Sequence, residues 1–177
     1  MPMGEEELLK LVQSKKYRPA GTDELADSLS VSGQQRAEFD ALLEDVQRRG
    51  LLVRVKKQWV VPQAAGLVVG RLQCNPRGFG FLVPAAHDAE DVYVAEEDMG
   101  EAMHDDLAVV ELQRKPAQAR RGRKLGPAGR VIKIIEHHNR ELIGTFTPGP
   151  KFGRVVPDNA RLFRDVYVDW VDWMIVV

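Results

Sequence analysis

The sequence contains very little cysteine or histidine. Cys74 is its only cysteine in 177 residues, so no disulfide can form within the chain and a Cys-rich zinc site is excluded. The four histidines, His87, His104, His137 and His138, are not spaced as metal ligands. We therefore expect no cofactor in this chain, and a single cysteine fits a reducing compartment.

Long hydrophobic runs are missing as well. No apolar stretch approaches the roughly 18 residues that indicate a membrane-spanning helix. The first seven residues, Met-Pro-Met-Gly-Glu-Glu-Glu, are acidic where a secretory signal is basic and then apolar. We expect a cytoplasmic protein that does not associate with a membrane.

An excess of one charge is also absent, since the formal net charge is −1. This value hides two opposite segments. Residues 88–111 contain ten acidic and no basic residues, whereas residues 114–133 contain eight basic and no acidic residues. We expect the acidic segment, with Glu96, Glu97, Asp98, Asp105 and Asp106, to be a solvated loop and turn surface. The adjacent carboxylates of Asp105 and Asp106 would not both face one metal ion.

Residues 1–63 predict a winged helix-turn-helix domain. Apolar residues recur at helical spacing in Glu5–Lys16, in Asp23–Leu29 and in a third segment with Phe39, Leu42, Leu43 and Val46. We expect Thr22 to cap the second helix, and Ser32 with Gln35 forms a capping-box pattern before the third. Two alternating runs then flank Lys56-Lys57 and predict a hairpin.

The third helix of this domain is unsuited to reading DNA. Gln34, Gln35 and Arg36 begin it, but four acidic residues follow: Glu38, Asp40, Glu44 and Asp45. An acidic helix face is repelled by a phosphate-lined groove. We expect either weak RNA contact through the hairpin (Arg54, Lys56, Lys57) or protein contact through this domain, with Trp59 in its core.

Residues 66–136 predict a five-stranded barrel of the OB type. Five short runs rich in β-branched and aromatic residues are separated by Gly, Pro and Asp: Leu67–Cys74, Gly78–Pro84, Asp91–Ala95, Leu107–Leu112 and Arg130–Ile135. A basic loop, Pro116–Pro127, interrupts the last two. Its Arg120, Arg121, Arg123 and Lys124 are candidate nucleic-acid contacts, because loops flank the binding face of such barrels.

A partial repeat indicates a second, incomplete OB barrel over residues 140–177. Two segments occur twice in the same order. The first copy has Gly-Phe-Gly-Phe-Leu-Val-Pro at residues 78–84 and Asp-Val-Tyr-Val at 91–94. The second has Lys-Phe-Gly-Arg-Val-Val-Pro at 151–157 and Asp-Val-Tyr-Val at 165–168. Only about three strands fit before Val177. We expect the chain to be cut short or another chain to complete this barrel.

The segment Arg77-Gly-Phe-Gly-Phe81 is the strongest functional signal. Alternate side chains of a strand share one face, so Phe79 and Phe81 point the same way, and a neighbouring strand brings Tyr93 close. Such rings stack on unpaired bases, while Arg71 and Arg77 meet phosphates. The alternative is that a ring fills the barrel core, but Leu82, Val92 and Val94 already supply inward-facing positions.

These motifs resemble a known family. Arg-Gly-Phe-Gly-Phe-Leu followed by Asp-Val-Tyr-Val resembles the two RNA-contacting motifs of cold-shock domains. Their order over nearly the whole chain resembles the N-terminal region of the ribonuclease R type of RNB exoribonucleases. Supporting stretches are Met103–Asp106, Gly129–Glu136, Ile143–Phe146 and Val155–Asp158.

The resemblance implies an α+β multidomain chain whose winged helix precedes two cold-shock/OB domains. It also implies an RNA-binding module of a 3′-to-5′ exoribonuclease. Single-stranded RNA would be the partner, and this chain would hold no catalytic site of its own. Hydrolysis, with its Mg²⁺, would take place in a catalytic RNB domain beyond Val177.

The chain departs from the family pattern at three places. A glycine is expected where Asp105 stands. In Lys151-Phe152-Gly153-Arg154, the basic residue Arg154 stands where the second aromatic residue would be. This replacement weakens stacking in the second barrel and favours contact with phosphate. Residues 169–177 do not resemble the family's continuation.

Two other classes of function stay open. A stand-alone, non-enzymatic protein would be either a cold-shock-like RNA chaperone or a winged-helix regulator that binds duplex DNA. A module that docks only on proteins would have no affinity for nucleic acid.

Overall fold

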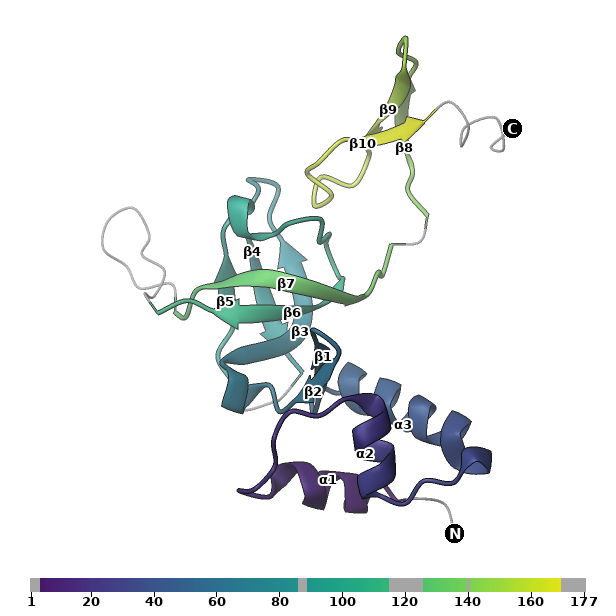
Figure 1. Ribbon diagram of the computed structural model, residues 1–177. Coiled ribbons are helices and arrows are strands. Elements are labelled where there is room, and N and C mark those ends of the chain that lie inside the picture. The colour runs from purple at the N-terminus through teal and green to yellow at the C-terminus, as the bar shows by residue number, and fades with distance from the viewer. Residues whose placement is uncertain (1–3, 86–88, 115–125, 140, 170–177) are drawn as a thin grey trace.

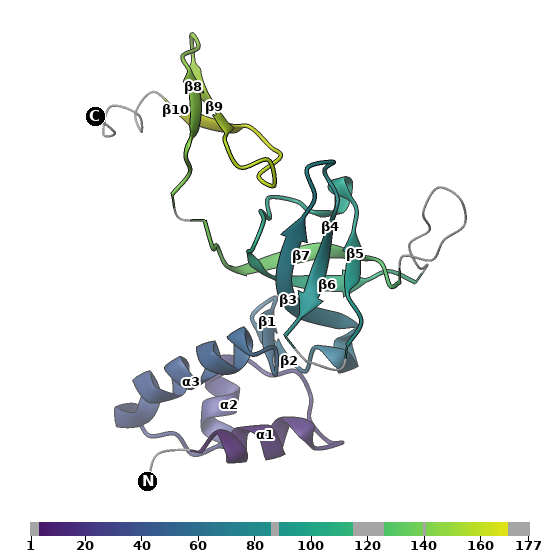
Figure 2. The same cartoon turned by 180° about the vertical axis from the view of Figure 1, so that it is seen from behind.

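The computed structural model describes residues 4–85, 89–114, 126–139 and 141–169. Three parts follow one another along an extended molecule: a helical part at the N-terminus, a curled sheet in the middle, and a small sheet near the C-terminus (Figures 1 and 2). No helix in the described ranges is both long enough and apolar enough to span a membrane.

The helical part consists of three α-helices and a hairpin. Its elements are α1 (Glu5–Gln13), α2 (Thr22–Ser28), the 3-10 turn η1 (Gly33–Gln35), α3 (Arg36–Arg48), β1 (Val53–Val55) and β2 (Gln58–Val60). The apolar stripes predicted from spacing face one core, where Leu8, Phe39, Leu43 and Trp59 are buried. The core forms because each helix has one apolar face that it buries against the others.

Thr22 does not cap the second helix, which corrects the expectation. Gly21 occupies the N-cap, and its backbone N–H donates to Glu24 Oε2 at 2.7 Å. The Thr22 hydroxyl Oγ1 instead accepts the Trp59 indole N–H at 3.0 Å. The buried indole needed a hydrogen-bond partner, and the first residue of α2 lies within its reach.

The middle part is a five-stranded antiparallel sheet in the order β5-β4-β3-β6-β7. Its strands are β3 (Leu67–Cys74), β4 (Gly80–Pro84), β5 (Val92–Val94), β6 (Leu107–Leu112) and β7 (Gly129–Glu136), with 3-10 turns η2 (Gln63–Ala65) and η3 (Glu96–Asp98). A single parallel bridge between Tyr93 and Ala128 brings the two ends of the sheet together. The five predicted strands are confirmed, although β4, β5 and β7 differ from the predicted bounds by one or two residues, and the curled sheet is consistent with an OB fold.

Cross-strand register determines which residues of this sheet face the barrel core and which lie on its outer face. Leu72, Leu82 and Val92 stand opposite one another on β3, β4 and β5 and are buried in the barrel core. On the outer face the hairpin's Val53 packs in one cluster with Val69 and Val109. The helical part therefore covers only part of the outer face.

The small sheet repeats the register of the first three barrel strands. Its strands, β8 (Gly144–Thr147), β9 (Phe152–Pro157) and β10 (Val166–Asp169), form a sheet in the order β10-β9-β8. Gly144 pairs with Pro157 as Gly70 pairs with Pro84. A Cβ on either glycine would come within about 2 Å of a carbonyl oxygen on the partner strand. The repeat read from the sequence therefore extends to strand pairing.

The residue that replaces an expected glycine adopts a glycine conformation. Asp105 has φ 66°, in the left-handed region that favours glycine. We predict that Asp105→Gly raises the free energy of unfolding by about 0.5–1 kcal/mol, measured by urea denaturation. Asp158→Gly, at an exposed position outside the left-handed region, should lower it. A loss of stability in Asp105→Gly would mean that the contact of Asp105 with His104, at 3.4 Å, outweighs the backbone strain.

Candidate nucleic-acid interface

A tight turn places the aromatic motif at the end of the β3–β4 hairpin. The sequence Asn75-Pro-Arg-Gly78 has the residues that a type I turn prefers, and Gly78 N donates to Asn75 O at 2.9 Å. Asn75 Oδ1 also accepts the backbone N–H of Arg77 at 3.0 Å. Gly78 then takes φ 93°, and a Cβ there would lie 2.4 Å from Glu96 Oε2. This turn leaves Arg77 exposed at its tip and delivers Phe79 to the strand.

Three aromatic rings meet on the outer face of the sheet. Phe81 and Tyr93 are direct cross-strand partners on β4 and β5, and Phe79 lies two residues before Phe81 on the same face. Ring centroids are 6.0 Å apart for Phe79–Phe81, 5.8 Å for Phe79–Tyr93 and 5.7 Å for Phe81–Tyr93. These are favourable separations for aromatic pairs, so the rings form one cluster, which we call the aromatic face.

The aromatic face lies outside the barrel core. All three rings are only partly buried, and none belongs to the apolar cluster of Leu72, Leu82 and their neighbours. The structure thus favours the interpretation in which inward positions are filled by aliphatic residues and the rings remain accessible. A partly exposed ring offers a π surface to any unstacked base.

Polar groups border the rings on β3. Arg71 is exposed, and its Nη1 donates to the backbone oxygen of Asp105 at 2.9 Å. Gln73, which no motif in the sequence singled out, is exposed and stands directly opposite Phe81. The alternation of polar and apolar residues in Arg71-Leu72-Gln73-Cys74 was the available signal for it. An amide in this row can donate to and accept from a base edge.

The small sheet carries a weaker version of the same face. Phe152 and Tyr167 form an edge-to-face pair with centroids 5.2 Å apart, and both are exposed. Arg154 stands opposite Tyr167 in this sheet, and at the equivalent position of the barrel Phe81 stands opposite Tyr93. Arg154 Nη1 lies 3.2 Å from Asp165 Oδ2, so a carboxylate already compensates the cation expected to meet phosphate. Lys151 is exposed beside this pair.

The basic loop lies outside the described residues. Arg120, Arg121, Arg123 and Lys124, which we expected to contact nucleic acid, all fall within residues 115–125. They stay predictions.

Two acidic residues expected on a solvated surface are in fact buried. Asp106 is 0% exposed, and its carboxylate accepts the backbone N–H groups of Met103 at 2.9 Å and His138 at 3.0 Å. Asp98 is 8% exposed and binds Arg130 Nε at 2.6 Å. Burial became possible because each carboxylate found hydrogen-bond donors. These hydrogen bonds hold parts of the fold together, and the described residues contain no group of three His, Cys, Asp or Glu side chains that could hold a metal ion.

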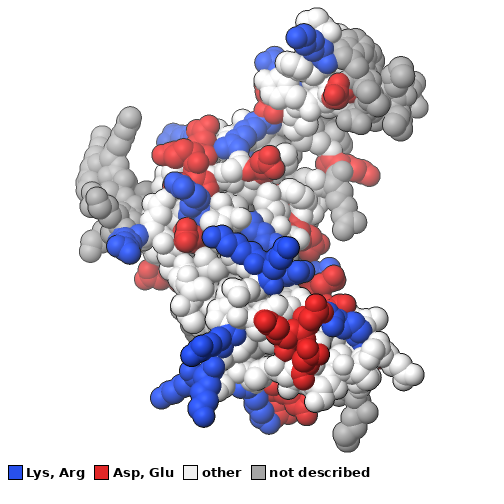
Figure 3. Space-filling model, in the orientation of Figure 1, with Lys and Arg blue, Asp and Glu red and all other residues white. Residues whose placement is uncertain are grey.

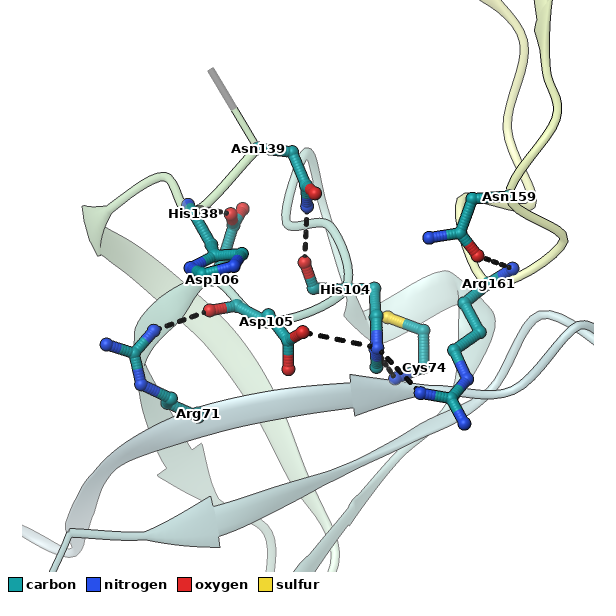
Figure 4. A network of polar contacts seen from close by, with 9 residues as sticks. All are labelled: Arg71, Cys74, His104, Asp105, Asp106, His138, Asn139, Asn159 and Arg161. Carbon is teal, nitrogen blue, oxygen red and sulfur yellow. Dashed lines mark hydrogen bonds and ion pairs between the residues drawn. The ribbon is translucent and has the colours of Figure 1, made fainter. Parts of the chain in front are cut away.

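A polar network joins the barrel to the segment that leads to the small sheet (Figure 4). His104 Nδ1 accepts the backbone N–H of Cys74 at 3.1 Å. Asn139 Nδ2 donates to His104 O at 2.6 Å, and Arg161 Nη1 lies 3.2 Å from His104 Nε2. Burial raises the pKa of Cys74 to about 11, so its thiol stays protonated, and the side chain packs in the barrel core.

Comparisons with known proteins find one matching domain family and several similar ribonucleases. A model of the Ribonuclease B OB domain matches residues 70–134. Ribonuclease R of Escherichia coli (strain K12) is 28% identical over 158 residues, covering 88% of this chain and 18% of that protein. Ribonuclease R of Thermotoga maritima is 27% identical over 161 residues, covering 90% of this chain and 21% of that protein. The structure of yeast Ssd1, a pseudonuclease, aligns with a TM-score of 0.49 and 19% identity over 59% of this chain and 18% of that one.

This chain therefore spans about a fifth of the length of these two ribonucleases. The matched segment begins in β3 and ends in β7, so it includes both strands that carry the aromatic face. Residues 70–134 match the Ribonuclease B OB domain, and over most of its length the chain is similar to one part of an RNB-family ribonuclease.

Proposed function

We propose that this chain is the RNA-capturing N-terminal module of a ribonuclease R-like 3′-to-5′ exoribonuclease. The observation that carries the proposal is the aromatic face: Phe79, Phe81 and Tyr93 clustered on the outside of an OB-type sheet, with Arg71 and Arg77 exposed at its border. Bases stack on the rings with little sequence preference, and the arginines add a salt-dependent attraction for phosphates.

In this proposal the helical part is a winged helix and the small sheet is the beginning of a second cold-shock domain. The three helices and the hairpin support the first assignment, and the repeated register supports the second. The module delivers single strands to a catalytic RNB domain outside this chain, which would hold Mg²⁺, and it works in the cytoplasm.

Fluorescence anisotropy of the 177-residue chain with labelled single-stranded RNA, and with duplex DNA of the same sequence, tests the proposal. We expect tighter binding of the single strand and weaker binding as salt rises. A preference for duplex DNA would replace the proposal with a winged-helix regulator. No affinity for either would replace it with a protein-docking module.

A further inference from the structure

A groove lies where the helical part meets the barrel. It has a volume of about 700 Å³ and is lined by Arg54, Lys56, Lys57 and Lys133, with Val60 and Leu67 among its apolar residues. Three of the cations come from the β1–β2 hairpin and the fourth from β7. In Figure 3, Lys and Arg side chains gather in the middle of the molecule, with a patch of Asp and Glu below them.

The cations of the groove are not compensated by acidic partners. None of the four forms an ion pair with a described residue, whereas Arg36, Arg48 and Arg49 of the neighbouring helix and its C-cap all do. The acidic residue on the groove wall, Glu111, is the cross-strand partner of Arg130. The groove therefore holds a local excess of positive charge in a chain whose net charge is −1.

Hydrogen bonds hold the two walls of the groove together. Lys133 Nζ donates to Gln47 Oε1 and to Arg54 O, both at 3.0 Å, and Gln47 Oε1 also accepts the backbone N–H of Arg54 at 3.1 Å. Burial, with a smaller contribution from Arg54, lowers the pKa of Lys133. A bound anion would offset the smaller of these two effects, the repulsion between Lys133 and Arg54.

The hairpin turn itself is unfavourable for its sequence. Lys56 has φ 48° and Lys57 φ 71°, the two left-handed residues of a two-residue type I′ turn. Asn-Gly is the preferred sequence for that turn, and lysine has no local hydrogen bond to offset the strain. Two lysines at this position lower stability while presenting two charges at the mouth of the groove.

We infer that this groove binds the sugar–phosphate backbone of RNA, as a second contact separate from the aromatic face. The inference rests on the proposed function. Four cations from two parts of the chain attract phosphates, and the apolar floor accommodates the ribose edge. The helical part then takes part in RNA capture through its hairpin and not through the acidic third helix.

The variant Lys56→Asn/Lys57→Gly separates binding from stability. It supplies the preferred type I′ sequence, so we expect the midpoint of thermal unfolding to rise by about 2–4 °C. Its affinity for single-stranded RNA should fall about tenfold near 0.1 M salt. The slope of log K against log salt should decrease by about 1.4, since each phosphate contact contributes about 0.7 for a single strand.

The control variant, Lys10→Gln/Lys16→Gln, removes the same charge from two exposed lysines that do not line the groove. It should keep the full salt slope. If Lys56→Asn/Lys57→Gly binds RNA as the unmodified chain does, or if the control loses as much, the groove is not a phosphate site. If the unmodified chain binds no single-stranded RNA, the proposed function fails first, and the two failures are thus distinguished.

Discussion

Phe79→Ala/Phe81→Ala is expected to weaken binding of single-stranded RNA about 30-fold or more. Each base stacked on a ring contributes about 1–3 kcal/mol, and 1.4 kcal/mol corresponds to a factor of ten in affinity. Both rings are partly exposed and lie outside the barrel core. The fold should therefore survive, and anisotropy titration with a labelled single strand measures the effect.

Two further variants make this prediction specific to stacking. Phe79→Tyr/Phe81→Tyr keeps both π surfaces and should retain most of the affinity. Val83→Ala shortens an aliphatic side chain on the same face of β4 and should change affinity little. Wild-type affinity in a folded Phe79→Ala/Phe81→Ala variant would remove the aromatic face from the proposed function.

The salt dependence of the same titrations separates the two proposed contacts. Loss of the rings removes a nonionic contribution, so the slope of log K against log salt should stay unchanged in the double alanine variant. The hairpin variant is expected to alter this slope. Two variants with different signatures would show that stacking and phosphate binding occur at different places on the chain.

Asp106→Ala is expected to lower the free energy of unfolding by about 2–4 kcal/mol, since it leaves hydrogen-bond donors without their acceptor. The carboxylate accepts the backbone N–H groups of Met103 and His138 and lies 3.0 Å from His137 Nδ1. It is fully buried, so the substitution removes a buried hydrogen-bond acceptor. Urea denaturation followed by circular dichroism measures the loss.

Asp158→Ala provides the matched control, because Asp158 is exposed and exposed substitutions of this kind change stability by about 0.5 kcal/mol or less. Equal effects in the two variants would show that burial of the Asp106 carboxylate does not stabilise the barrel. A large effect confined to Asp106 would show that the network in Figure 4 holds the β6 entrance in place.

The elements followed from local patterns in the sequence. The short apolar runs Leu67–Cys74 and Leu107–Leu112 predicted strands that the structure has with the same bounds. The stripe of Phe39, Leu43 and Val46 marked the buried face of α3. These predictions succeed because the direction of successive side chains depends only on the backbone geometry of one helix or strand.

Local patterns failed where burial depends on distant partners. In the sequence, Asp106 is one of ten acidic residues in the segment 88–111. It is nevertheless buried, because the backbone N–H groups of residues 103 and 138 both donate to its carboxylate. Thr22 reads as a cap, yet its hydroxyl is used by the indole of Trp59, 37 residues away. Neither partner is visible from sequence neighbours.

By itself, the sequence determined the strand and helix order, the repeat, and the three rings that share a strand face, since these depend on spacing along one or two adjacent strands. Only the tertiary structure decided that the rings stay outside the core, that Gln73 joins their row, and that Arg54 and Lys133 line one groove. Register across strands and packing between separate parts of the chain determine those relations. Both arise from long-range contacts that no local pattern encodes.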